Sequence, residues 1–83
     1  MHNSIMNQFN GIVLVDGESL SFDFSLIHTI KGEKFFIVVL KNRASFIFDM
    51  QKDGYGKWQI LEPYPKWVKP FTEQLSYIID QNI

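Results

Sequence analysis

In the segment SLSFDFSLI, residues 19–27, polar and apolar residues alternate from Ser19 to Leu26. Successive side chains of a β-strand point to opposite sides, so this segment predicts a strand with one buried face and one solvent-exposed face. The residues on the apolar face are Leu20, Phe22, Phe24 and Leu26. Asp16-Gly17 stands just before this strand and is a strong signal for a tight hairpin turn, so an earlier strand should pair with it.

Other apolar runs precede and follow this strand in the sequence, and each is bounded by residues that favour a turn. The connections between them are short, and short connections force neighbouring strands to be antiparallel. Residues 1–8 are polar and are expected to form a flexible N-terminus ahead of a single domain, residues 9–83. The expected strands are residues 9–15, 19–27, 34–40, 44–50 and 57–61.

The apolar period becomes helical after Pro65. At about 100° per residue, six apolar side chains fall within one arc, which predicts an amphipathic helix over residues 66–82. These side chains are Trp67, Val68, Phe71, Leu75, Ile78 and Ile79. Pro70 cannot donate a backbone hydrogen bond, so the helix either kinks there or begins near it. Because Trp67 and Val68 keep the same phase as the later residues, the sequence favours the kink.

The order of five strands and one helix predicts an α+β fold. We expect a five-stranded antiparallel β-meander with one C-terminal amphipathic helix packed across one sheet face. The covered face should carry Leu20, Phe22, Phe24, Leu26, Phe46, Phe48 and Met50. A single helix does not cover a whole sheet, so the opposite face is expected to be mixed in polarity.

The composition limits how such a small domain is stabilised. The chain has 83 residues, of which 16% are aromatic and none is cysteine, so disulfides and cysteine-based zinc sites are excluded. The longest apolar run, residues 35–40, is far too short to span a membrane. A net charge of -1 and a single arginine, Arg43, argue against nucleic acid as a partner. No signal peptide is visible, so the expected compartment is the cytoplasm.

The motifs that carry catalysis or bind cofactors are missing. His28 stands at a strand end, without the cysteine or Gly-x-Ser-x-Gly element that a nucleophilic site would need. Asp16-Gly17-Glu18 is better explained as a hairpin turn than as a metal site. Gly54-Tyr55-Gly56 runs into a strand, whereas a phosphate-binding loop runs into a helix. We therefore predict no catalytic, cofactor-binding or metal-binding residues and no enzymatic activity.

These exclusions favour a non-catalytic protein-interaction module, with a second copy or another protein as its partner. It would self-associate through the uncovered sheet face or a sheet edge. The candidate surface residues are Ile27, Val39, Ile47, Tyr55, Tyr64 and Tyr77. The alternative is a binder of small apolar ligands, with a pocket between sheet and helix. A small enzyme is the third and least favoured interpretation.

Overall fold

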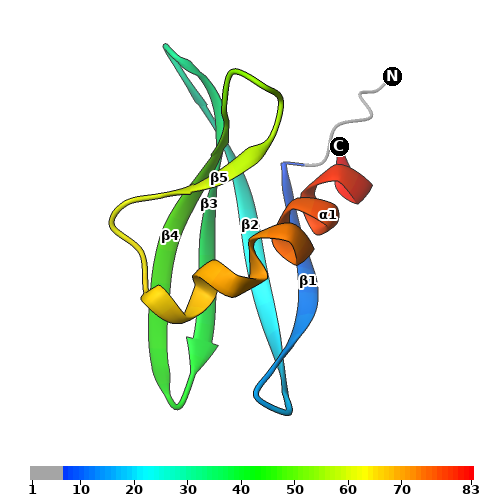
Figure 1. The fold of residues 1–83 in the computed structure, drawn as a ribbon, viewed down its shortest axis with the longest axis vertical. Helices are drawn as coiled ribbons and strands as arrows, with labels where there is room; N and C mark the ends of the chain where they lie inside the picture. Colours follow the sequence, from blue (N-terminus) through cyan, green and yellow to red (C-terminus); the bar gives the residue numbers. More distant parts are fainter. Residues whose placement is uncertain (1–6) are drawn as a thin grey trace.

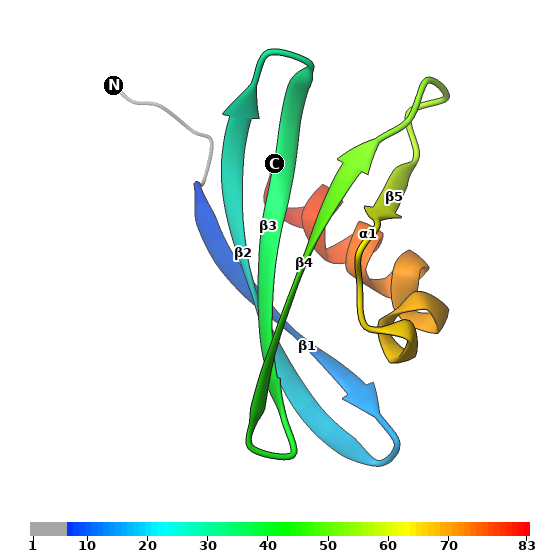
Figure 2. The ribbon, with the colours of Figure 1, turned by 90° about the vertical axis from the view of Figure 1, so that its left-hand side faces the viewer.

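The computed structural model describes residues 7–83 and shows the predicted α+β architecture (Figure 1). Five strands form one antiparallel sheet in the order β1-β2-β3-β4-β5. The strands are β1 (Gln8–Val15), β2 (Glu18–Thr29), β3 (Gly32–Lys41), β4 (Ala44–Lys52) and β5 (Trp58–Leu61). A 3-10 helix, η1 (Lys66–Phe71), then leads into the helix α1 (Thr72–Asn82). Figure 2 shows this helical segment on one side of the twisted sheet.

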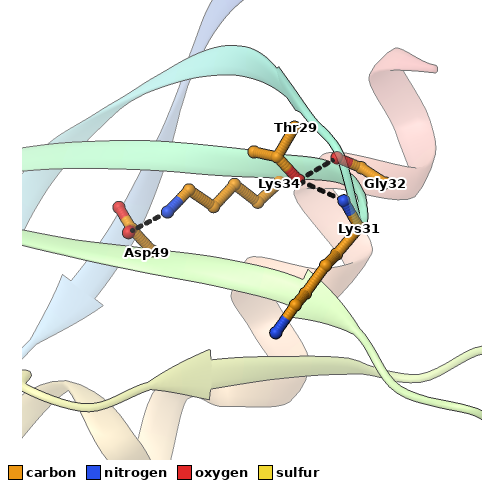
Figure 3. Close-up of polar contacts among 5 residues, drawn as sticks. All are labelled: Thr29, Lys31, Gly32, Lys34 and Asp49. Atoms are coloured by element: carbon orange, nitrogen blue, oxygen red, sulfur yellow. Dashed lines mark hydrogen bonds and ion pairs between the residues drawn. The ribbon is translucent and has the colours of Figure 1, made fainter.

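The central hairpin is longer than the sequence predicts. β2 continues to Thr29 and β3 begins at Gly32, because a tight turn joins them directly. The Thr29 hydroxyl donates a hydrogen bond to the Gly32 carbonyl at 2.6 Å and accepts one from the Lys31 N–H at 3.2 Å (Figure 3). At the N-terminus, Gln8 already belongs to β1. The rest of the predicted flexible segment, apart from Asn7, lies outside the described residues.

Two hairpin turns contain adjacent residues with positive φ. Asp16 and Gly17 have φ of 51° and 80°, and Asn42 and Arg43 have φ of 52° and 66°. Two positive φ values in a two-residue loop define the type I′ turn, whose twist matches that of the flanking strands. These turns fix the register, with Val15 opposite Glu18 and Lys41 opposite Ala44.

The inner face of the sheet carries the core, as predicted. Leu20, Phe22, Phe24, Phe48 and Met50 are buried, and Leu26 and Phe46 pack against them. β3 adds Phe35, Ile37 and Val39 to the same face. Val39 was predicted to lie on the interaction surface, and this is wrong: it is 1% exposed, because it lies opposite Phe22 of β2 and Phe46 of β4.

The predicted helix over residues 66–82 is present as two pieces of different geometry. The six residues of η1 form a 3-10 helix that contains Pro70, and the α-helix begins only at Thr72. Thr72 donates its backbone N–H and its hydroxyl to the Lys69 carbonyl, the latter at 2.6 Å. The expected kink at Pro70 is therefore replaced by a change of helix type, in keeping with the donor that proline lacks.

The helix α1 contacts the first and last strands of the sheet. Ile78 lies over Gly11 of β1, where an added Cβ would come within 2.7 Å of two of its carbon atoms. At the other edge, the indole Nε1 of Trp58 in β5 donates a hydrogen bond to Asp80 at 3.0 Å. Leu75 and Ile79 of α1 are fully buried between these contacts. The helix thus covers the inner face, and no helix of residues 7–83 covers the outer face.

Candidate functional site

The outer face of the sheet exposes large apolar side chains. Ile12 and Leu14 of β1 are 62% and 63% exposed, Leu40 of β3 is 60% exposed and Ile47 of β4 is 57% exposed. Strand parity places all four side chains on the side opposite α1. A contiguous apolar patch on such a face indicates an interaction surface, whereas single exposed apolar side chains do not.

The first part of this face is an apolar row along β3. Phe36 and Val38 are half-buried, Leu40 follows them on the same side, and Ile47 lies directly opposite Val38. An ion pair limits the row at one end: the Lys34 ammonium lies 2.9 Å from an Asp49 carboxylate oxygen (Figure 3). Each of these two side chains is 29% exposed, so the pair is partly shielded from solvent. The apolar row therefore has a defined end.

The second part of the face is strand β1, which a polar row separates from β3. From Ser19 to Ser25 the outer residues of β2 are all polar, namely Ser19, Ser21, Asp23 and Ser25. In the register of the hairpin, Ile12 lies opposite Ser21 and Leu14 lies opposite Ser19. Both exposed side chains on β1 therefore have a small polar neighbour on β2 rather than an apolar one.

Strand β1 is also an open edge of the sheet. Within residues 7–83 it has a sheet neighbour on one side only, β2. Its eight residues, QFNGIVLV, include no charged residue and no proline. Proteins commonly protect an edge strand with lysine, proline or a bulge, because unpaired backbone groups there attract other strands. β1 has neither of the first two protections.

An open hollow of about 430 Å³ lies beside this edge, between β1 and α1. Its floor includes Ile12 and Val13 of β1. The side formed by α1 consists of Glu73, Gln74, Tyr77 and Ile78. Tyr77 is exposed, so the hollow joins an apolar strand to an aromatic side chain on the helix.

The predicted interaction residues do not form one surface. Ile47 is exposed and Ile27 half-buried on the outer face, whereas Val39 belongs to the core. Tyr77 lies on α1 beside the β1 edge. Tyr64 is half-buried against the core, with the Lys69 ammonium 5.8 Å from its ring centroid.

Tyr55 stands apart from the others, in the loop between β4 and β5. It is 92% exposed, although the loop that carries it is well bonded. One oxygen of Asp53 accepts the backbone N–H groups of Tyr55 at 2.8 Å and Lys57 at 3.0 Å. The other accepts the Gln59 side-chain amide at 3.1 Å. These bonds to the ionised form lower the pKa of Asp53, with the Lys57 N–H as the largest cause.

The described residues form no arrangement with an evident reaction chemistry. His28 pairs with Glu33 at 3.3 Å on the exposed end of the central hairpin. Between residues 7 and 83 there is no group of three or more side chains that could hold a metal ion. The same part of the chain has no helix long and apolar enough to cross a membrane. Phe22, Val68 and Leu75 are fully buried between the sheet and the helical segment. Two open hollows lie at the edges of α1, one of about 430 Å³ beside β1 and one of about 580 Å³ beside β5.

No protein-family model matches the chain, and neither the curated proteins nor the solved structures compared with it give a match.

Sequence reasoning missed Ile12 and Leu14 as candidate surface residues. It treated residues 9–15 only as the partner of the alternating strand. A signal was nevertheless present, because the first strand of a meander must be an edge and this one has no charged residue. Those two facts together would have placed exposed apolar groups at an open edge.

Proposed function

We propose that this chain is a non-catalytic protein-interaction module that self-associates. The observation that carries the proposal is the outer sheet face, where Ile12, Leu14, Leu40 and Ile47 are each more than half exposed. Burying such side chains is favourable by about 25 cal/mol for each Å² of apolar surface removed from water. A second copy is the partner that the chain itself supplies, and closed two-fold dimers are the commonest oligomers.

The proposed compartment is the cytoplasm. The domain is stabilised by aromatic packing without a disulfide, as is usual for proteins of a reducing compartment. Stacking of Phe9 on Phe24 and edge contacts of Phe35 with Trp58 are part of that packing. No step of the proposed function requires a cofactor or a metal ion.

Sedimentation velocity over a range of protein concentrations tests the proposal. The monomer has a mass of 9.8 kDa, and we expect the weight-average mass to rise toward twice that value as concentration increases. If the mass stays at 9.8 kDa up to about 100 µM, the free energy of dimerisation is weaker than about -5.5 kcal/mol, and the proposal would be wrong.

A further inference from the structure

We propose that self-association occurs through strand β1, which pairs antiparallel with β1 of a second copy about a two-fold axis at Val13. Two five-stranded sheets would then join into one continuous ten-stranded sheet. This inference rests on the proposed function and deepens it, because it selects the sheet edge over the centre of the outer face. Three observations support it: the backbone groups of β1 that point away from β2, the exposed side chains of Ile12 and Leu14, and the lack of charged residues in β1.

The backbone argument follows from the register of the first hairpin. The Asn7 carbonyl accepts the Leu26 N–H at 2.8 Å, so Asn7 and Leu26 form a hydrogen-bonded pair. Such pairs alternate along an antiparallel ladder, which makes Phe9, Gly11, Val13 and Val15 the residues bonded to β2. The residues whose N–H and C=O groups point away from β2 are then Gln8, Asn10, Ile12 and Leu14. An extended strand is the occupant that can bond such a row of donors and acceptors.

The side chains indicate that the added strand is a second copy. A two-fold axis at Val13 places Ile12 opposite the partner's Leu14, and Leu14 opposite the partner's Ile12. Both are outward-bonding residues, so the new pairs are hydrogen-bonded pairs. Four apolar side chains would then meet on the outer face, where Ile12 and Leu14 now face only serines across the strand. Cross-strand apolar pairs of this kind stabilise a sheet, whereas an Ile–Ser pair contributes little.

The lack of charge in β1 and the hollow beside it also favour a second copy as the partner. β1 contains no charged side chain, so pairing with its own copy brings no like charges together within the strand. The hollow between β1 and α1 lies beside the edge and gives room for inner-face side chains of an added strand. Glu73, Gln74 and Tyr77, on the helix side of this hollow, would lie next to the partner, so Glu73 is the one charged side chain among the described residues that line the hollow.

Two matched substitutions separate the edge from the centre of the face. Ile12→Lys and Ile47→Lys replace isoleucines of similar exposure, 62% and 57%, on the same outer face. Lysine on an edge strand is a common natural block to strand pairing, and near a two-fold axis it also meets its own copy. We expect Ile12→Lys to raise the dimer Kd by about tenfold or more, and Ile47→Lys to change it by less than about twofold. Leu14→Lys provides a second edge variant if Ile12→Lys fails to fold.

The absence of cysteine from the chain allows a direct test of the register. Val13 and Val15 are both 2% exposed and lie on the same face of β1, so Val13→Cys and Val15→Cys are a matched pair. With the axis at Val13, residue 13 is opposite its own copy, within the roughly 4.4–6.8 Å between Cα atoms that a disulfide requires. Residue 15 lies opposite the partner's Gly11, far from its own copy. Mild oxidation should therefore cross-link Val13→Cys and not Val15→Cys.

Each result has a defined meaning. A monomeric wild-type protein would contradict both the proposed function and the edge. A dimer that Ile47→Lys weakens and Ile12→Lys does not would preserve self-association but reject the edge. Equal cross-linking of the two cysteine variants would reject the axis at Val13. Selective loss in Ile12→Lys with selective cross-linking at residue 13 would establish the ten-stranded sheet.

Discussion

Ile78 of α1 packs closely on Gly11 of β1. A Cβ at Gly11 would lie 2.7 Å from both Cδ1 and Cγ2 of Ile78, closer than carbon atoms pack. Gly11→Val should therefore force the helix away from the strand and lower the free energy of unfolding by about 1–3 kcal/mol. Urea denaturation measures the change.

Gly54→Val is the matched control for Gly11→Val. Gly54 lies in the loop before β5, and no heavy atom lies within 4 Å of the position that its Cβ would take. If both variants unfold at the same urea concentration, the loss at Gly11 does not come from Ile78. Adding Ile78→Ala to Gly11→Val should recover part of the lost stability, since the smaller side chain leaves room for the valine.

Asp53 gives the folded state a dependence on acid pH. Its pKa is lowered by the N–H groups of Lys57 and Tyr55 and by the Gln59 amide, so the folded state binds its proton less tightly than the unfolded state. The stabilisation is fully present above the unfolded pKa, near about 4, and is lost as pH falls through the lowered folded pKa. Asp53→Asn cannot lose a proton, so it lacks this dependence.

Thermal unfolding of wild type and Asp53→Asn across the acid range measures this effect. We expect wild type to have the higher Tm above about pH 5, with the difference shrinking below about pH 4. A Tm difference that does not change with pH would show that the charge on Asp53 contributes nothing to the loop. Amide exchange at Tyr55 and Lys57 should accelerate in the variant, because these N–H groups bond to Asp53.

At the level of elements, the bond from Trp58 to Asp80 joins β5 to α1. Trp58 is 6% exposed, and its indole Nε1 reaches Asp80 at 3.0 Å. Asp80→Ala leaves a nearly buried donor without this acceptor and should cost about 1–3 kcal/mol of unfolding free energy. Asp80→Asn keeps an oxygen acceptor and should cost less.

Glu73→Ala serves as the control for the Asp80 variants, because Glu73 is an exposed carboxylate on the same helix. Chemical denaturation followed by Trp fluorescence reports both stability and the surroundings of Trp58. Glu73 lies in the first turn of α1 and Asp80 near its end, so loss of the interaction with the helix dipole should destabilise Glu73→Ala but not Asp80→Ala. An Asp80→Ala variant as stable as wild type would mean that the bond to Trp58 contributes nothing.

The sequence predicts the elements well where alternation or helical period is clear. The alternating β2 placed Leu20, Phe22 and Phe24 on the core face, and the structure confirms all three. β3 is apolar on both faces, so alternation could not tell which side faces the helix. Only the register with β2 and β4 assigns Phe35, Ile37 and Val39 to the core, and the prediction for Val39 was wrong for that reason.

For a related reason, the sequence could not predict that residues 66–71 form a 3-10 helix and not an α-helix. The advance per residue is about 100° in an α-helix and about 120° in a 3-10 helix, and the two adjacent residues Trp67 and Val68 are too few to distinguish them. What separates them is the hydrogen bonding around Pro70 and Thr72. The Thr72 bonds to the Lys69 carbonyl span three residues, the spacing of a 3-10 helix, and the apolar pattern does not encode them.

For the whole molecule, the meander itself follows from the short connections, and the open edge follows from the meander. Consecutive pairing leaves the first strand with a free side, and β1 has neither charge nor proline to protect it. The candidate site could therefore be predicted in part: topology gives the edge and composition gives its lack of protection. The register that sets Ile12 and Leu14 against serines required the structure.

Self-association through β1 also couples the stability of the whole molecule to its concentration. A partner that binds only the folded state stabilises it by mass action, so the Tm of a dimer rises as protein concentration rises. We expect the Tm of wild type to increase over a hundredfold range of concentration, and the Tm of Ile12→Lys to begin rising only at a concentration about tenfold or more higher. Ile47→Lys should keep the wild-type dependence, because its side chain lies on β4, away from the edge. If Ile12→Lys and wild type showed the same dependence of Tm on concentration, the contact would lie elsewhere, since a lysine on β1 blocks only the pairing of β1 itself.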